Sequence, residues 1–173
     1  PGGAGCAAAA SSVGYDTNGN VVQSDDFAGR RVCSAFDVPR SLETIRVEGL
    51  PTSASCASLL LANATLPVGS RKVSRRWHPD WSLAAGRAEP GKLTTLVYNG
   101  QPDPFSGGTV ASCAPATSLP DGKPYALLCK QVEQATTDAD GSKGFAATLQ
   151  SGVANRISTW TYNASGKVLT ASD

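Results

Sequence analysis

The sequence predicts an all-β protein built as an antiparallel β-hairpin repeat array. Three observations lead to this class. A pattern of an aromatic residue, a polar residue, a glycine and an apolar pair occurs near both ends of the chain. Aromatic–polar pairs recur between these copies at intervals close to multiples of about 21 residues. The intervening stretches are short β-rich runs separated by turn residues, and a step of about 21 residues holds two strands and two turns, so one repeat is one hairpin.

The repeat unit is clearest in the copies YDTNGNVV (residues 15–22) and YNASGKVL (residues 162–169). In the first copy we expect Tyr15 to end a strand and pack on one face of the sheet. Asp16 is expected to fold its side chain onto the backbone two residues on, as an Asx-turn. Asn18-Gly19 is a strong hairpin signal, with Gly19 supplying a positive φ. The second copy assigns the same roles to Tyr162, Asn163 and Gly166.

Three further aromatic–polar pairs complete the repeat signature: Phe36-Asp37, Trp77-His78 and Tyr98-Asn99. Together these segments resemble the YD repeat of the bacterial RHS (rearrangement hot spot) family, whose units typically read YD-x-x-G-N/R-L/V. Residues 36–50 resemble the family's YD-x-x-R-N-L-E-T-x-R-x-E-G-L variant, and residues 77–99 resemble its WHP…AEPG-x-x-T-x-x-x-YD pair. The likeness covers roughly residues 13–170.

The first twelve residues, PGGAGCAAAASS (1–12), are expected to form a flexible, low-complexity lead-in. The hairpin array occupies residues 13–173. Its strand at residues 41–50 alternates between two faces, one with Leu42, Thr44, Arg46 and Glu48 and the other with Glu43, Ile45 and Val47. Neither set is cleanly apolar, so we expect a sheet with one face toward water.

Two insertions interrupt the array, at about 51–70 and about 101–129. In the first, a short helix near 57–63 and an irregular loop are alternatives. The final strand, at residues 168–171, stops in mid-repeat, so the array is expected to be truncated at its C-terminal end. Because the sequence also lacks methionine, we expect a segment of a longer protein.

The cysteines suggest disulfides rather than a metal site. Asp121 lies in the turn-forming sequence LPDGKP, and Cys113 and Cys129 lie eight residues before and after it. Positions placed symmetrically about a turn face each other across an antiparallel pair, so a Cys113–Cys129 bridge is expected if the protein is exported. The remaining cysteines are an odd set, Cys6, Cys33 and Cys56, within which Cys33–Cys56 is a candidate second bridge.

No catalytic, cofactor-binding or metal site is predicted, and we expect that the segment is not an enzyme. His78 is the sole histidine, and the repeat places a turn residue there. The acidic runs at residues 16–20 and 138–141 resemble the start of an EF-hand loop but lack its glutamate, so we interpret them as turns. A net charge of +1 with 17% charged residues argues against nucleic acid as a partner, and no apolar run approaches the length of a membrane helix.

The resemblance implies a function. RHS proteins wind YD hairpins into a hollow β-shell that encloses a C-terminal toxin used in interbacterial competition, often delivered by type VI secretion. The partners it implies are flanking repeats, the enclosed toxin and secretion proteins, and the location is secreted or at the cell surface. The family's shell-closing motif, D-P-x-G-x-x-D-G, does not occur here. The alternative is a surface adhesion or carbohydrate-binding module that uses Trp77, Trp81 and Trp160 as sugar platforms.

Overall fold

The computed structural model describes residues 10–115 and 118–173, and these residues are mostly antiparallel β-structure. The all-β class is therefore confirmed. The strands are β1 (Ser12–Tyr15), β2 (Val21–Asp25), β3 (Arg30–Asp37), β4 (Leu42–Pro51), β5 (Arg71–Trp77), β6 (Ala84–Glu89), β7 (Lys92–Tyr98), β8 (Leu128–Ala135), β9 (Arg156–Tyr162) and β10 (Val168–Ser172). The helical segments are α1 (Cys56–Leu59) and the 3₁₀ turns η1 (Val38–Arg40), η2 (Pro104–Ser106) and η3 (Gly144–Ala146).

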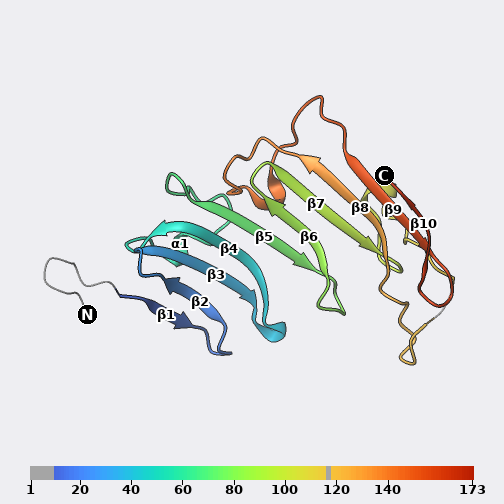
Figure 1. Ribbon diagram of the computed structural model, residues 1–173, viewed down its shortest axis with the longest axis horizontal. Helices are drawn as coiled ribbons and strands as arrows, with labels where there is room; N and C mark the ends of the chain where they lie inside the picture. The colour runs from blue at the N-terminus through green and yellow to red at the C-terminus, as the bar shows by residue number, and fades with distance from the viewer. Residues whose placement is uncertain (1–9, 116–117) are drawn as a thin grey trace, which may run out of the picture. The chain divides into compact units, whose positions relative to one another are not determined.

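The chain divides into two compact units. The first contains the residues up to 75 together with 88–91 and 136–148, and the second contains 76–87, 92–135 and 149–173. Within each unit, strands that follow one another in the chain pair antiparallel, β1 to β5 in the first and β7 to β10 in the second (Figure 1). Most of the expected lead-in, with Cys6, lies outside the described residues, and β1 begins at Ser12.

The expected alternation along residues 41–50 is wrong at its start, because β4 contains a β-bulge. Ala35 is opposite Ile45, but the next residue of β3, Phe36, is opposite Glu43. Thr44 is therefore an extra residue on β4. A bulge of this kind puts the side chains on either side of it out of the simple two-residue alternation. Glu43 consequently points to the opposite face from the one that the sequence suggested.

The face that Glu43 joins carries a row of ion pairs. Glu43 binds the guanidinium groups of Arg46 and Arg75. Glu48 continues the row, since Arg46 Nε and Arg71 Nη2 each lie 2.6 Å from its carboxylate oxygens. Hydrogen bonds from Arg46 and then Arg71 hold the pKa of Glu48 below its ordinary value. This face of the first unit is thus polar, as expected for a sheet with one side toward water.

The opposite face of the first unit holds its apolar core. The buried cluster consists of Cys33, Val47, Leu50, Leu59 and Leu66, and the last two come from the first insertion, residues 52–70. The helix in this insertion is the single turn α1, which is shorter than the expected range of 57–63. Because the strands supply few apolar side chains, the insertion completes the core from outside the sheet.

The described residues contain two disulfides, Cys33–Cys56 and Cys113–Cys129, with Cα–Cα distances of 5.3 and 5.4 Å. The second bridge does not arise from the extended hairpin that its symmetry about Asp121 suggested. Among the described residues around Asp121, the hairpin pairing amounts to one bridge between Ser118 and Pro124. Cys113 is instead positioned by β9, because the Tyr162 N–H donates to the Cys113 carbonyl at 2.8 Å.

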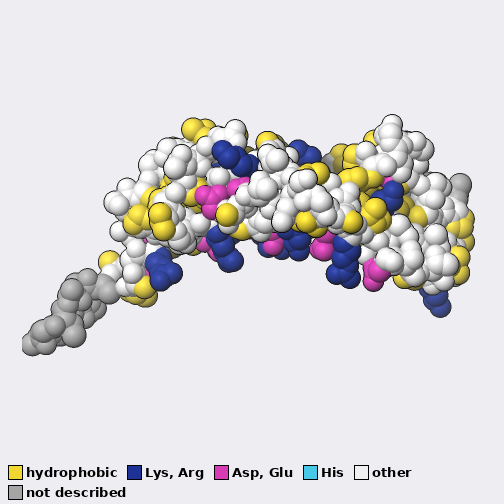
Figure 2. Space-filling model, turned by 90° about the horizontal axis from the view of Figure 1, so that it is seen from above, with side chains coloured by type: hydrophobic (Ala, Val, Ile, Leu, Met, Phe, Trp, Pro, Cys, Tyr) yellow, Lys and Arg dark blue, Asp and Glu magenta, His cyan; other side chains and the backbone are white. Residues whose placement is uncertain are grey.

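Charged side chains of both signs are interspersed over the visible surface (Figure 2). Arginines and lysines lie beside acidic side chains there, so this face has no separate basic patch. Among the described residues, no helix has both the length and the apolar character needed to span a membrane.

Candidate functional site

The five aromatic residues of the repeat signature all lie at the ends of odd-numbered strands. Tyr15, Trp77, Tyr98 and Tyr162 are the last residues of β1, β5, β7 and β9, and Phe36 is the next-to-last residue of β3. Their burial differs widely, since Tyr98 is 8% exposed and Tyr15 is 63% exposed. The position of each aromatic at a strand end is thus regular, whereas the packing role expected for Tyr15 is wrong.

The turn after Tyr15 is formed by the polar residue and the glycine of the repeat. The Asp16 carboxylate accepts the N–H groups of Asn18 and Asn20, both at 2.9 Å, which is the expected Asx-turn. The Gly19 N–H donates to the Asp16 carbonyl, and Gly19 has a φ of 81°. Asn18 does not share this left-handed backbone, so the turn is not the two-residue hairpin that Asn-Gly favours. It is a longer loop, closed by the Asp16 N–H on the Asn20 carbonyl, with the glycine directly before Asn20.

The same loop recurs at Asn163, where the second copy of the repeat predicts it, and at Asp26, where the aromatic spacing did not place one. Asp26 accepts the N–H groups of Ala28 and Arg30 between β2 and β3, and Asn163 accepts those of Ser165 and Lys167 between β9 and β10. The Asp26 loop follows an aspartate rather than an aromatic residue, so the aromatic spacing does not mark it, although Ala28-Gly29 is a turn signal that breaks the strands at this point. A search for Asp or Asn followed three residues later by glycine finds all three loops.

The other polar residues of the signature have different roles. Asp37 precedes η1 and pairs with Arg40 at 4.0 Å. His78 is 3% exposed, and its Nδ1 accepts the Asp80 N–H at 3.1 Å. The buried Asn99 side chain accepts the Cys113 N–H at 3.1 Å and so holds the second insertion. These contacts give His78 and Asn99 structural roles at the ends of β5 and β7.

Tyr98 and His78 are packed together in the second unit. Their rings meet edge to face, with centroids 5.5 Å apart and an interplanar angle of 80°. The Tyr98 hydroxyl donates to the Ala84 carbonyl at 2.9 Å, and burial raises the pKa of this hydroxyl. The ring contact and the hydroxyl bond link the ends of β5, β6 and β7, and Tyr98 is the most buried of the signature aromatics.

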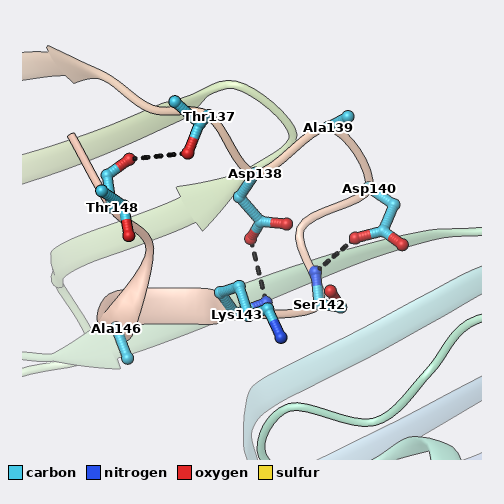
Figure 3. A pocket seen from close by; sticks show the side chains of 8 residues that line it. All are labelled: Thr137, Asp138, Ala139, Asp140, Ser142, Lys143, Ala146 and Thr148. Atoms are coloured by element: carbon cyan, nitrogen blue, oxygen red, sulfur yellow. Dashed lines mark hydrogen bonds between the residues drawn. The ribbon is translucent and has the colours of Figure 1, made fainter. Parts of the chain in front are cut away.

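One cavity of the first unit lies within the loop of residues 137–148 and measures about 400 Å³ (Figure 3). The loop is closed at its base, because the Thr137 N–H and hydroxyl both donate to the Thr148 carbonyl. Asp138 accepts the Lys143 N–H at 2.9 Å. Hydrogen bonds from Ser142, through its side chain and its N–H, hold the pKa of the Asp140 carboxyl below its ordinary range.

The polar side chains that line this cavity form hydrogen bonds within the loop itself. Asp138 and Asp140 each use a carboxylate oxygen on the loop's own backbone (Figure 3). Gly141 lies so close to β5 that a Cβ atom would meet the Lys72 carbonyl oxygen at 2.0 Å. No group of three or more histidine, cysteine, aspartate or glutamate side chains suited to a metal gathers in the part of the chain that the structure describes. The hydrogen bonds of Asp138 and Asp140 thus stabilise the fold of the loop.

Lys72 is the residue of the first unit that sequence reasoning missed. It is 2% exposed, and its ammonium group donates to the carbonyls of Leu59 and Leu61 in the first insertion. Its own N–H donates to the Asp140 carbonyl at 2.8 Å. A sequence pattern gives no sign of such a role, because every residue has a carbonyl group that a lysine can bind.

No protein-family description matches the sequence, and no curated protein matches it.

Proposed function

We propose that this chain is a wall segment of an RHS-type β-shell that encloses a C-terminal toxin and takes no part in catalysis. The observation that carries the proposal is the coincidence of the aromatic–polar signature with the ends of β1, β3, β5, β7 and β9. Each interval between successive signature aromatics then spans one hairpin, and the two longer intervals also contain inserted loops. The hairpin is the unit from which the resemblance implies that the shell is wound.

The mechanism of such a segment is enclosure. A hairpin repeat buries its side chains mainly against its neighbours, so the wall grows by stacking of units and not around a single core. Two disulfides suit a protein that works outside the reducing cytosol, which supports export in a secreted or cell-surface protein. Partners in this reading are flanking repeats, the enclosed toxin and secretion proteins.

The gene beyond the codon for Asp173 tests the proposal. We expect it to encode further YD repeats, then the D-P-x-G-x-x-D-G motif and then a toxin domain. In the full-length protein, limited proteolysis should leave that toxin domain uncut while the shell is intact. A reading frame that ends soon after Asp173, or a toxin domain cut as fast as a free one, contradicts the proposal.

A carbohydrate-binding module is the second candidate, and the surroundings of Trp81 favour it. Trp81 is partly exposed, and Lys123 Nζ lies 5.9 Å from the centroid of its ring. Lys123 also pairs with Asp80 at 2.6 Å. An aromatic ring beside a charged donor and a charged acceptor is a combination that can hold a sugar. Saturable binding on a glycan array that Trp81→Ala abolishes would support this function, and an array without binding would exclude it.

A further inference from the structure

The first insertion, residues 52–70, is attached to the sheet of the first unit through a small number of identifiable contacts. The Cys33–Cys56 disulfide joins it covalently to β3. Leu59 and Leu66 pack against Val47 and Leu50. Two cationic side chains from the sheet bind its backbone carbonyls. The insertion is thus held by contacts that differ in kind, and each can be removed separately.

Lys72 on β5 is the first of these cations. Its Nζ lies 2.6 Å from the Leu61 carbonyl oxygen and 3.2 Å from that of Leu59. Burial lowers the pKa of this amine, although Asp138 and Asp140 oppose the effect. A buried ammonium that loses these carbonyls would lack hydrogen-bond acceptors, so Lys72 favours the attached position of the insertion.

Arg31 on β3 is the second cation. Its Nη1 donates to the Ala54 carbonyl at 2.6 Å, near the start of the insertion. The remaining donors are fixed by a two-pronged pair with Asp25, at 2.7 and 2.8 Å. Because Asp25 orients the guanidinium, the bond to Ala54 is preorganised. The insertion is therefore held by Arg31 near its beginning and by Lys72 near its middle.

The two cysteines of the disulfide differ in their exposure to solvent. Cys33 has no exposed surface and belongs to the apolar cluster, whereas Cys56, the first residue of α1, is partly exposed. A thiolate that attacks a disulfide must reach one of the two sulfurs. Attack at Cys56 expels Cys33 as a thiolate into apolar surroundings, which disfavour a charge. Lifting of the insertion relieves this cost because it admits water.

We propose that residues 52–70 form a redox-operated cover over the sheet of the first unit, which a dithiol reductant releases, and that Lys72 and Arg31 limit the rate of its release. The proposal rests on these contacts and does not depend on the shell function. If that function holds, the cover would stay attached in an oxidising exterior and detach in a reducing compartment.

The chemistry is a two-electron exchange. A thiolate of the reductant attacks Cys56 Sγ, which forms a mixed disulfide, breaks the Cys33–Cys56 bond and leaves Cys33 to take up a proton. The second thiol of the reductant then attacks its own sulfur in the mixed disulfide. It releases Cys56, which is protonated in turn, and the reductant leaves as a cyclic disulfide. The apolar side chains of Val47 and Leu50 lose their cover when the insertion lifts.

Reduction kinetics of the intact chain test the proposal, with Cys113–Cys129 as an internal control. The two bridges are followed separately by timed reduction with dithiothreitol, alkylation and peptide mass spectrometry. We expect Lys72→Met to accelerate reduction of Cys33–Cys56 at least about tenfold and to leave Cys113–Cys129 unchanged. Lys130→Met, the matched variant in the second unit, should leave Cys33–Cys56 unchanged. Equal acceleration of both bridges by Lys72→Met, or no acceleration, overturns the proposal.

Two measurements keep the test decisive if Lys72→Met does not fold. Arg31→Met removes the other carbonyl contact and is judged by the same ratio of the two reduction rates. Hydrogen exchange of the wild-type chain gives the second measurement. On reduction, the amides of Leu59, Leu60 and Ser70, which donate within the insertion, should exchange at least about tenfold faster than the paired amides of β3 and β4. Unchanged protection of the insertion, or an equal loss in β3 and β4, overturns the proposal.

Discussion

Tyr98 allows the packing role of the repeat aromatic to be measured. It is the most buried of the five signature aromatics, its ring meets His78 edge to face, and its hydroxyl binds the Ala84 carbonyl. Tyr98→Phe removes the hydroxyl bond alone, and a buried hydrogen bond of this kind contributes about 1 kcal/mol. Tyr98→Ala also removes the ring and leaves a cavity, so the total loss should reach about 3–5 kcal/mol.

The tryptophans make the measurement specific to one unit. Trp77, Trp81 and Trp160 are the only tryptophans of the sequence, and all three belong to the second unit, as Tyr98 does. Urea unfolding followed by tryptophan fluorescence therefore reports on the unit that the substitution affects. Far-UV circular dichroism, which reports on both units, shows whether they unfold together, as a single free energy of unfolding requires.

Two exposed tyrosines serve as controls. Tyr125→Ala removes an exposed ring of the second unit, and Tyr15→Ala removes the exposed ring at the equivalent repeat position of β1. Both should change the free energy of unfolding by no more than about 0.5 kcal/mol. A Tyr98→Ala midpoint equal to that of the wild type would refute the packing role. A Tyr98→Phe loss as large as that of Tyr98→Ala would show that the hydroxyl, and not the ring, carries the effect.

Three further outcomes are expected. Gly19→Ala should cost about 1–2 kcal/mol, because its left-handed backbone has open space around it, whereas Gly141→Ala should cost clearly more in urea unfolding, since its Cβ would overlap a β5 carbonyl. Equal losses of unfolding free energy for the two variants would contradict the close approach of Gly141 to β5. Glu48→Gln should remove part of the acid sensitivity: the lowered pKa of Glu48 means that its contribution is present above its ordinary value of 4.5 and lost as pH falls below it. If the free energy of unfolding of Glu48→Gln falls between pH 7 and pH 3 as steeply as that of the wild type, this expectation is contradicted. Asp26→Ala should lower the melting temperature slightly, and no change would show that its Asx-turn bonds are dispensable.

The sequence predicted the hairpin framework because that framework is encoded locally. An aromatic at a strand end, an Asx side chain and a glycine with positive φ act within a few residues of one another. The loop at Asp26 is encoded locally as well, since Ala28-Gly29 is a turn signal between two strands, although the aromatic spacing does not mark it. The sequence does not predict the bulge at Thr44, because the bulge depends on the register between β3 and β4, which alternation within one strand does not reveal.

The attachment of the insertions could not be predicted from local patterns. Lys72 binds backbone carbonyls, and carbonyls occur at every position of a chain. The Cys113–Cys129 bridge was expected from symmetry about a turn, but the structure reaches it through β9. Pairings of this kind depend on which strand an irregular segment folds over, and no short motif specifies that choice.

The two insertions are attached in comparable ways, which suggests why the array needs them. Each has a disulfide to a strand of its own unit, and each is bound by a lysine near the start of the strand that follows it. Lys72 binds carbonyls in the first unit, and Lys130 binds the buried carboxylate of Asp103 in the second. The strands of the first unit give one face to ion pairs and offer few apolar side chains on the other. A sheet of this composition buries too little apolar surface by itself, so an added segment must supply it, and a covalent bond with a charged contact keeps that segment in place without a large core.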